Sequence, residues 1–416
     1  MSVYPGKVQY LDEAGAMLAQ GPCQATFQDG GCIVTPAAGT PLAFDLGDVD
    51  RIAPAEWDIQ LFLYTGRSLA LKQFGAAFSQ MAGELTAAWR DRTIACLLLE
   101  DLQEIDRYTG NANGVPAEIR IFRSNLAILP QSGLPVQWRL AEIESCTFDN
   151  AAYSVVLQRA GDQLVLSKLG RKTDEAFGKL RAAIDALHTQ SAGTLRDLFP
   201  FLNADALVRL QREMPEGRSC PVPALTAIHA DLPGTMREKA VDDSLAPYLD
   251  ALAERAIAPA YVGFKFMSGS LDRDAKTDSS GEDAVPAPEP AADTGDDAGE
   301  QLFFWYFYPL RNNLVAWEAT NGTGRATYLF RCPGAVQDCV AALTRGLALV
   351  NFRREPVYLP DTSIERQPRY QRYAIGARKL PDLRALRAAL VGRVIHTSLE
   401  AWQAQIDSLT NGASLG

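Results

Sequence analysis

The chain has 416 residues, which is more than one hydrophobic core usually serves, and its 47% hydrophobic and 22% charged residues are typical of globular proteins. Its formal net charge is -10, but the segment 272–300 contributes -8 of this, because it contains ten Asp and Glu residues and only two basic residues, Arg273 and Lys276. The near-neutral remainder argues against general affinity for nucleic acid or for an anionic membrane.

The N-terminal segment has no apolar run after its first charges, and no run of 18 apolar residues occurs anywhere in the sequence. We therefore expect neither export nor a membrane span. The seven cysteines are an odd number at scattered spacings, which favours reduced thiols over a disulfide framework. Together these features predict a cytoplasmic protein, and the abundance of Ala, Arg and Leu is compatible with a bacterial source.

The N-terminal part of the chain predicts short strands joined in hairpins. Its apolar or alternating runs are separated by turn residues such as Asp29-Gly30-Gly31 and Thr65-Gly66-Arg67. The apolar period then changes, because Phe78, Met81 and Leu85 are three or four positions apart. That spacing forms one face of a helix, so the strands are expected to end in a helix.

The same pattern returns 94 to 95 positions later, so that about 118–184 repeats about 24–89. Turn residues and apolar positions match, whereas no acid, base or ligand is shared. The matched sets are Pro36, Gly39 and Pro41 with Pro130, Gly133 and Pro135; Phe44, Leu46 and Val49 with Trp138, Leu140 and Ile143; and Gly66, Leu69, Leu71 and Gly75 with Gly161, Leu164, Leu166 and Gly170. Duplication predicts two modules, 1–95 and 96–190, each a meander of antiparallel strands closed by one helix.

This order of six or seven strands and one capping helix, with the Pro-x-x-Gly-x-Pro hairpin and the Leu-x-Leu strand before the helix, resembles the pleckstrin-homology-like (PH-like) superfold, including its bacterial versions. The resemblance implies a fold and leaves the ligand open, because members bind lipids, peptides, phosphoproteins and other folded domains. Lipid-binding members carry clustered Lys and Arg in the first hairpin. Here that loop is 28–31 in one copy and 123–125 in the other, and neither loop contains a cluster of Lys and Arg. Phosphoinositide binding is therefore disfavoured.

After the modules, 191–259 has helical periodicity and predicts a helical connector. The last region, 260–416, predicts an α+β domain of antiparallel strands and a helix at 335–350, followed by an extended piece and a final helix from about Asp382 to Leu409. Its segment 268–300 is rich in Ser, Asp, Ala, Pro and Gly and is predicted to be a disordered acidic insertion. We leave open whether this domain is a third, diverged PH-like copy. The predicted fold class is α+β throughout.

An unbroken aromatic run, 303–308, predicts a strand with aromatic residues on both faces. One interpretation is a docking surface on one face, with Trp305 and Phe307 as its candidate residues. The other is a central strand covered on both sides, which is the more common use of such a strand.

Basic residues are concentrated at 365–393, with two tyrosines interleaved. Arginine next to aromatic rings can bind single-stranded nucleic acid or a phosphorylated partner, whereas charge runs more often form a solvated surface. The candidate residues for binding a partner or an anion are Arg366, Arg369, Tyr370, Arg372, Tyr373, Arg378 and Lys379.

A smaller basic group, Lys168, Arg171 and Lys172, is predicted where the last strand of the second module turns into its helix. Exposed amides and the positive end of the helix dipole would favour phosphate there. The first module has Lys72, Phe74 and Gly75 around the matching junction, so the feature is not shared by both copies.

No catalytic motif, nucleotide fingerprint or metal-ligand spacing occurs, and the three histidines are far apart in sequence. We therefore predict no enzyme activity, no cofactor and no metal. The favoured hypothesis is an adaptor or scaffold that binds another macromolecule, most simply a protein, through the modules. The alternatives are a peripheral membrane or phosphoinositide binder, a nucleic-acid or histone-type chaperone that uses the acidic segment, and an unrecognised enzyme.

Overall fold

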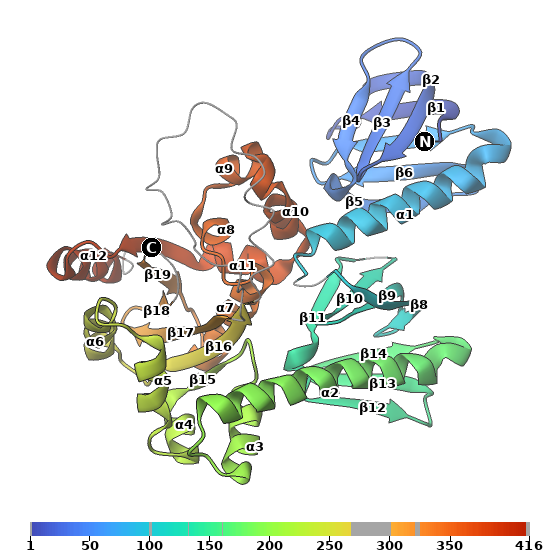
Figure 1. Cartoon of the computed structure of the whole chain (residues 1–416). Coiled ribbons are helices and arrows are strands. Elements are labelled where there is room, and N and C mark those ends of the chain that lie inside the picture. The colour runs from blue at the N-terminus through green and yellow to red at the C-terminus, as the bar shows by residue number, and fades with distance from the viewer. Residues whose placement is uncertain are drawn as a thin grey trace, which may run out of the picture. The chain divides into compact units, whose positions relative to one another are not determined.

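The computed structural model describes residues 2–99, 102–131, 133–159, 161–267, 301–320 and 325–412. The chain divides into two compact units (Figure 1). The first unit comprises Met1–Arg139, Ser145–Leu180 and Asp361–Pro381, and the second comprises Leu140–Glu144, Arg181–Pro360 and Asp382–Gly416. The predicted acidic insertion at 268–300 lies outside the described residues.

The first module contains an antiparallel sheet of seven strands and one helix. Its strands lie in the order β4-β3-β2-β1-β7-β6-β5, so the first strand pairs with both the second and the seventh. Val8 in β1, for example, is paired with Gly21 on one side and Leu71 on the other. The elements are β1 (Tyr4–Leu11), β2 (Met17–Gln28), β3 (Gly31–Pro36), β4 (Leu42–Asp45), η1 (Leu46–Asp48), β5 (Val49–Pro54), β6 (Asp58–Leu63), β7 (Ser68–Lys72), η2 (Gly75–Ala77) and α1 (Phe78–Cys96).

The predicted apolar face of α1 closes this sheet. Phe78, Met81 and Leu85 are buried in one cluster with side chains of the strands, including Val34 and Leu71. Burying side chains of this size stabilises the module by about 2 kcal/mol for each one. The helix was therefore located correctly by its three- and four-residue spacing.

The second module repeats this architecture. Its strands lie in the order β11-β10-β9-β8-β14-β13-β12, which is the order of the first module shifted by seven strands. The prediction of repeated antiparallel strands followed by a helix is confirmed at the level of strand order. The elements are β8 (Glu104–Ala112), β9 (Val115–Phe122), β10 (Asn125–Pro130), β11 (Val136–Arg139), η3 (Leu140–Glu142), β12 (Ser145–Asp149), β13 (Ser154–Arg159), β14 (Asp162–Ser167), η4 (Gly170–Lys172) and α2 (Thr173–Leu198).

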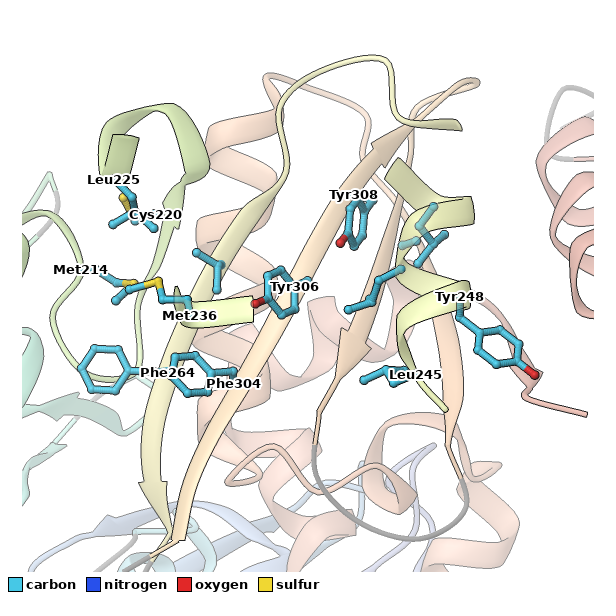
Figure 2. Close-up of a cluster of buried hydrophobic side chains, with 14 of the residues drawn as sticks. Met214, Cys220, Leu225, Met236, Leu245, Tyr248, Phe264, Phe304, Tyr306 and Tyr308 are labelled. Atoms are coloured by element: carbon cyan, nitrogen blue, oxygen red, sulfur yellow. The ribbon is translucent and has the colours of Figure 1, made fainter. Parts of the chain in front are cut away.

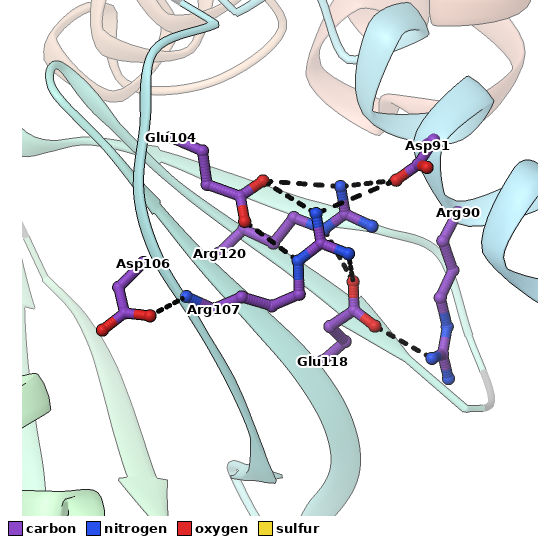
Figure 3. A network of polar contacts seen from close by, with 7 residues as sticks. All are labelled: Arg90, Asp91, Glu104, Asp106, Arg107, Glu118 and Arg120. Atoms are coloured by element: carbon purple, nitrogen blue, oxygen red, sulfur yellow. Dashed lines mark hydrogen bonds and ion pairs between the residues drawn. The ribbon is translucent and has the colours of Figure 1, made fainter.

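A polar network joins the two modules within the first unit (Figure 3). The Arg120 guanidinium, with a side chain only 4% exposed, pairs with Glu118 at 2.6 Å and with Asp91 of α1 at 2.8 Å. Arg90, also from α1, donates to the other Glu118 oxygen at 2.9 Å. Because a buried charge requires partners, these pairs hold the end of α1 against β9.

The second unit is built on a six-stranded antiparallel sheet in the order β15-β16-β17-β18-β19-β20. These strands follow one another in sequence, so the sheet does not reproduce the strand order of the modules and gives no support to a third copy. The strands are β15 (Ser219–Pro221), β16 (Tyr261–Met267), β17 (Gln301–Leu310), β18 (Leu314–Ala319), β19 (Ala326–Arg331) and β20 (Leu390–Ile395).

Helices α3 to α6 pack on this sheet, and Figure 2 shows part of their shared core. Phe304, Tyr306 and Tyr308 of β17 belong to this core together with Met236 and Leu249 from the helices. The segment predicted as a helical connector therefore forms part of the core of the second unit and also supplies its first strand, β15. The helices are α3 (Ala204–Glu213), α4 (Val222–Ile228), α5 (Leu232–Ala240) and α6 (Ala246–Arg255).

The C-terminal region differs from its prediction. The stretch expected to be extended contains short helices, and the single final helix is interrupted by β20, which pairs with β19. β20 includes Val391, Val394 and Ile395, and such β-branched side chains favour a strand once a neighbour is available. The helices are α7 (Val336–Leu349), α8 (Glu355–Tyr358), α9 (Asp361–Arg366), η6 (Pro368–Tyr370), α10 (Gln371–Lys379), α11 (Pro381–Ala389) and α12 (Leu399–Gly412).

Candidate functional site

A groove of about 590 Å³ lies beside the second half of α2 and is a candidate site, which we call the α2 groove. Binding sites for small ligands or for anchoring side chains commonly have such a volume. Three segments line it: the link from η3 to β12, the helices α2 and α3, and the loop that leads to β15. The lining residues are Ala141, Glu142, Ile143, Glu144, Leu187, His188, Ser191, Val208, Gln211, Arg212, Glu213, Pro215, Glu216 and Arg218.

Local structure holds the walls of the α2 groove in place. The Gln211 side chain of α3 donates a hydrogen bond of 2.7 Å to the His188 carbonyl near the end of α2. Arg218 pairs with Glu144 at 2.9 Å, which connects the loop before β15 to the η3 link. These contacts fix the two sides of the groove while the space between them stays open.

The α2 groove is lined by more negative than positive charge. Four glutamates and two arginines give its lining a net charge of -2 with His188 neutral. At least one glutamate also supports the fold, because Glu216 accepts a hydrogen bond from the Phe266 backbone at 3.2 Å. The charge balance suits a ligand that carries positive charge.

The floor of the α2 groove combines apolar and polar groups. Ile143 is buried, and Ser191 is 5% exposed with a hydroxyl that has no hydrogen-bond partner among the described residues. A buried hydroxyl without a partner costs free energy, about 1–3 kcal/mol.

The predicted basic junction of the second module is present as a local feature. Lys168, Arg171 and Lys172 are all exposed and lie around η4, where β14 turns into α2. Lys168 has a φ of +56° at this turn, and the Lys172 ammonium lies 5.8 Å from the centre of the Tyr108 ring. The three cations are thus accessible to solvent.

The predicted basic stretch near the C-terminus is divided between solvent and the protein. Arg366 and Arg369 are exposed, and Arg369 stacks on Tyr370 at 4.7 Å. Arg372 packs over Tyr373, whose ring is buried. Arg366 and Arg369 thus remain accessible on α9 and η6, and Tyr370 and Arg372 are half-buried. The prediction that Tyr373 binds a partner is corrected, because its side chain belongs to the interior of the first unit.

Arg378 and Lys379, by contrast, do not form a free binding surface. Arg378 pairs with Asp48 at 2.5 Å and lies 3.7 Å from the centre of the Tyr64 ring. Lys379 is 3% exposed, and its ammonium donates to the Val49 carbonyl at 2.9 Å. Both residues hold α10 on the first module, so the prediction that they bind a partner is corrected.

Trp305 and Phe307 are also not docking residues, because both side chains are fully buried. The Trp305 indole donates to the Ser219 hydroxyl at 2.8 Å and packs on Phe352 at a centroid distance of 4.1 Å. Since its neighbours Phe304 and Tyr306 face the core of α3 to α6, β17 is covered on both sides. The aromatic run therefore marks a central strand.

A second polar group lies inside the second unit. Glu318 is fully buried and accepts a hydrogen bond of 2.6 Å from Thr327, while His396 lies 3.4 Å from the other Glu318 oxygen. The His396 ring is stacked on Tyr248 at 3.9 Å, and Trp402 donates to the Thr327 hydroxyl. These aromatic rings enclose the pair, so we interpret it as structural.

Sequence reasoning did not identify the α2 groove. Its acidic residues are ordinary surface charges in the sequence, and Ser191 carries no motif. The repeat did align Val49 with Ile143, which placed the η1 and η3 links in equivalent positions. It could not indicate which of those links the rest of the chain covers.

Within the described parts of the chain, no three His, Cys, Asp or Glu side chains are grouped so that they could hold a metal ion. No helix among these residues has the length and apolar character needed to cross a membrane. Cys23 and Cys96 are buried, and burial raises the pKa of each thiol to about 11, so both stay protonated near neutral pH.

Comparison of the sequence with models of protein families and with curated proteins finds no match.

Proposed function

We propose that this chain is a non-enzymatic cytoplasmic adaptor whose two modules are PH-like and which binds a protein segment in the α2 groove. The strand order and the closing helix of each module support the PH-like assignment. The α2 groove supports the binding function, because it lies between the link that leads to the edge strand β12 and the helix α2. Grooves beside helices and sheet edges are recurring places for peptide recognition.

The observation that carries this proposal is the open volume of the α2 groove together with its predominantly acidic lining. A catalytic centre would need convergent acids, bases or nucleophiles with a common target. In the α2 groove Arg218 is instead paired with Glu144, and Glu216 accepts a hydrogen bond from the Phe266 backbone. Recognition of a partner is thus the simplest use of the site.

Site-specific photo-crosslinking tests the proposal. A photoreactive residue replaces Val208, which is 65% exposed on the wall of the α2 groove, and in a matched control it replaces Trp57, which is also 65% exposed but lies on the first module. We expect one protein adduct at position 208 and none at 57. The partner is then purified, and its binding to the full chain is measured by calorimetry.

Ser191→Trp, which fills the floor of the α2 groove, should abolish both the adduct and the calorimetric signal. The Ser191→Ala variant serves as its folding control. Identical adducts at 208 and 57, or binding that Ser191→Trp leaves unchanged, would contradict the proposal.

The membrane alternative rests on Lys168, Arg171 and Lys172. It predicts salt-sensitive sedimentation with vesicles containing phosphatidylserine and a phosphoinositide, which is lost when Arg171 and Lys172 are both changed to Glu. The adaptor proposal predicts that the protein stays in the supernatant in both forms. The chaperone alternative predicts that deleting 272–300 abolishes binding to histones, whereas the adaptor proposal predicts no effect of this deletion on the partner of the α2 groove.

A further inference from the structure

Within the described residues, a helix of the same chain packs against the first module at the position where the second module has the α2 groove. In the first module the space between η1 and the end of α1 is occupied by α10 of the same chain. Arg378 pairs there with Asp48, and Lys379 donates to the Val49 carbonyl. Gly376 packs against the Cys96 carbonyl at the end of α1, where a Cβ atom would approach the oxygen to 3.2 Å.

Close contacts along α10 show how the first module accommodates a helix at this position. A Cβ atom at Gly47 would lie only 2.8 Å from the Ile375 side chain, so the absence of a side chain in η1 admits the helix. Ile375 is fully buried, and Arg378 is three positions further along. α10 therefore offers an apolar residue, a small residue and a basic pair to the module.

The repeat places the α2 groove at the equivalent position of the second module. A shift of 94 residues brings Asp48 onto Glu142 and Val49 onto Ile143, and a shift of 95 residues brings Cys96 onto Ser191. All three of the resulting residues line the α2 groove. An acidic residue is thus found in both modules at the position where the first one pairs with Arg378.

Among the helices that the structure describes, none occupies the α2 groove as α10 occupies the equivalent position of the first module. α3 supplies one wall through Gln211, but about 590 Å³ remains between α3 and the η3 link. The Ser191 hydroxyl at its base has no hydrogen-bond partner in the described structure. The volume, the acidic lining and the helix seated at the equivalent position of the first module together indicate that a ligand is to be accommodated.

We propose that the α2 groove binds a basic amphipathic helix of a partner protein, in which a large apolar residue, a small residue and an Arg-Lys pair have the spacing of Ile375 to Lys379. This inference rests on the proposed function and specifies the chemistry of the partner. The arginine of the partner helix pairs with Glu142, and its apolar side chain enters the groove above Ile143. Because Leu187 stands where the first module has Arg92, the α2 groove offers an apolar contact at a position that is charged in its counterpart.

The test uses a labelled synthetic peptide of residues 369–382, which contains α10, and fluorescence anisotropy with the full-length protein. We expect saturable binding that Glu142→Lys weakens at least tenfold. Asp48→Asn is the matched control, and it should change binding by no more than about twofold if the peptide occupies the α2 groove rather than replacing α10. A peptide with the change Arg378→Glu should lose binding.

Two further measurements separate recognition from damage to the fold. The Glu142→Lys protein should regain affinity for the Arg378→Glu peptide, a rescue that a misfolded variant would not show. Val208 is exposed on the wall of the groove. Val208→Arg should weaken binding of the wild-type peptide, whereas Val208→Glu should not.

Absence of saturable peptide binding, or binding that Asp48→Asn abolishes and Glu142→Lys leaves intact, would overturn the inference. A dimer of the protein that disappears in the Glu142→Lys variant would also overturn it, since the groove would then hold a second copy of this chain. If the crosslinked partner binds at Val208 but the peptide does not, the adaptor function stands and only the basic-helix specificity fails.

Discussion

Arg378 of α10 forms an ion pair with Asp48 of η1, a residue 330 positions earlier in the chain. The pair connects the segment 361–381 to the first module. The first unit therefore contains segments that are far apart in the sequence. Both side chains are partly buried, at 22% and 28% exposed, so the pair is better shielded than an ordinary surface contact.

Reversing the charge of Arg378 should release α10 from the first module. We expect Arg378→Glu to lower the free energy of unfolding by about 1–3 kcal/mol, because it places two carboxylates together in a partly buried position. Limited proteolysis should then cut within 361–381. Arg366→Glu, a change at an exposed position of α9, is the control and should alter stability by less than about 0.5 kcal/mol. Equal protease resistance of both variants and the wild type would show that the ion pair does not hold α10.

Lys379 should make stability depend on pH in the alkaline range. Burial lowers its pKa from the ordinary value of 10.5, so above the lowered pKa the unfolded chain holds this proton more tightly than the folded protein does. Stability therefore rises with pH until about pH 10.5, where the unfolded lysine also loses its proton.

The matched variant for this effect is Lys379→Met. It leaves the Val49 carbonyl with its second donor, the Trp89 indole at 2.9 Å. In urea unfolding at a series of pH values from 7 to 10, the free energy of the wild type should rise relative to that of Lys379→Met. A difference that stays constant over this range would mean that Lys379 keeps an ordinary pKa.

Removing Arg120 should be costly, because it leaves buried acidic groups with fewer partners. Its side chain is 4% exposed and that of Glu118 is 8% exposed. We expect Arg120→Met to destabilise the protein by about 3–5 kcal/mol in chemical denaturation. The double variant Arg120→Met with Glu118→Gln should recover a large part of the loss, since the buried negative charge is then gone. Additive losses in the double variant would contradict a direct interaction.

The approach of β16 to β17 requires a glycine at position 263. A Cβ atom there would lie 2.3 Å from the Trp305 ring and 2.9 Å from the Arg218 carbonyl. Gly263→Ala should therefore lower the free energy of unfolding by about 1–3 kcal/mol. At Gly234 in α5 a Cβ atom would meet nothing within 4 Å, so Gly234→Ala should raise stability by about 0.5–1 kcal/mol. Two variants with the same sign of effect would show that the packing around Trp305 is looser than described.

Local patterns in the sequence were sufficient for the elements of the two modules. The helical spacing of Phe78, Met81 and Leu85 appears as the buried face of α1, and the matched turn glycines Gly66 and Gly161 have φ values of +85° and +88°. Turn chemistry and periodicity act over a few residues, so a single sequence displays them. The same local signals were misleading at β20, where helical spacing competes with pairing to a strand about 60 residues away.

The sequence by itself thus determined the repeat, the α+β class and the position of most module elements. Only the tertiary structure decided that α10 fills the groove of the first module and that the equivalent groove of the second module stays open. The physical reason is that a groove is defined by what covers it, and Asp48 meets Arg378 only through contacts between distant segments. The same holds for Trp305 and Phe307, whose aromatic character predicts burial or docking equally well until helices are placed on both faces of β17.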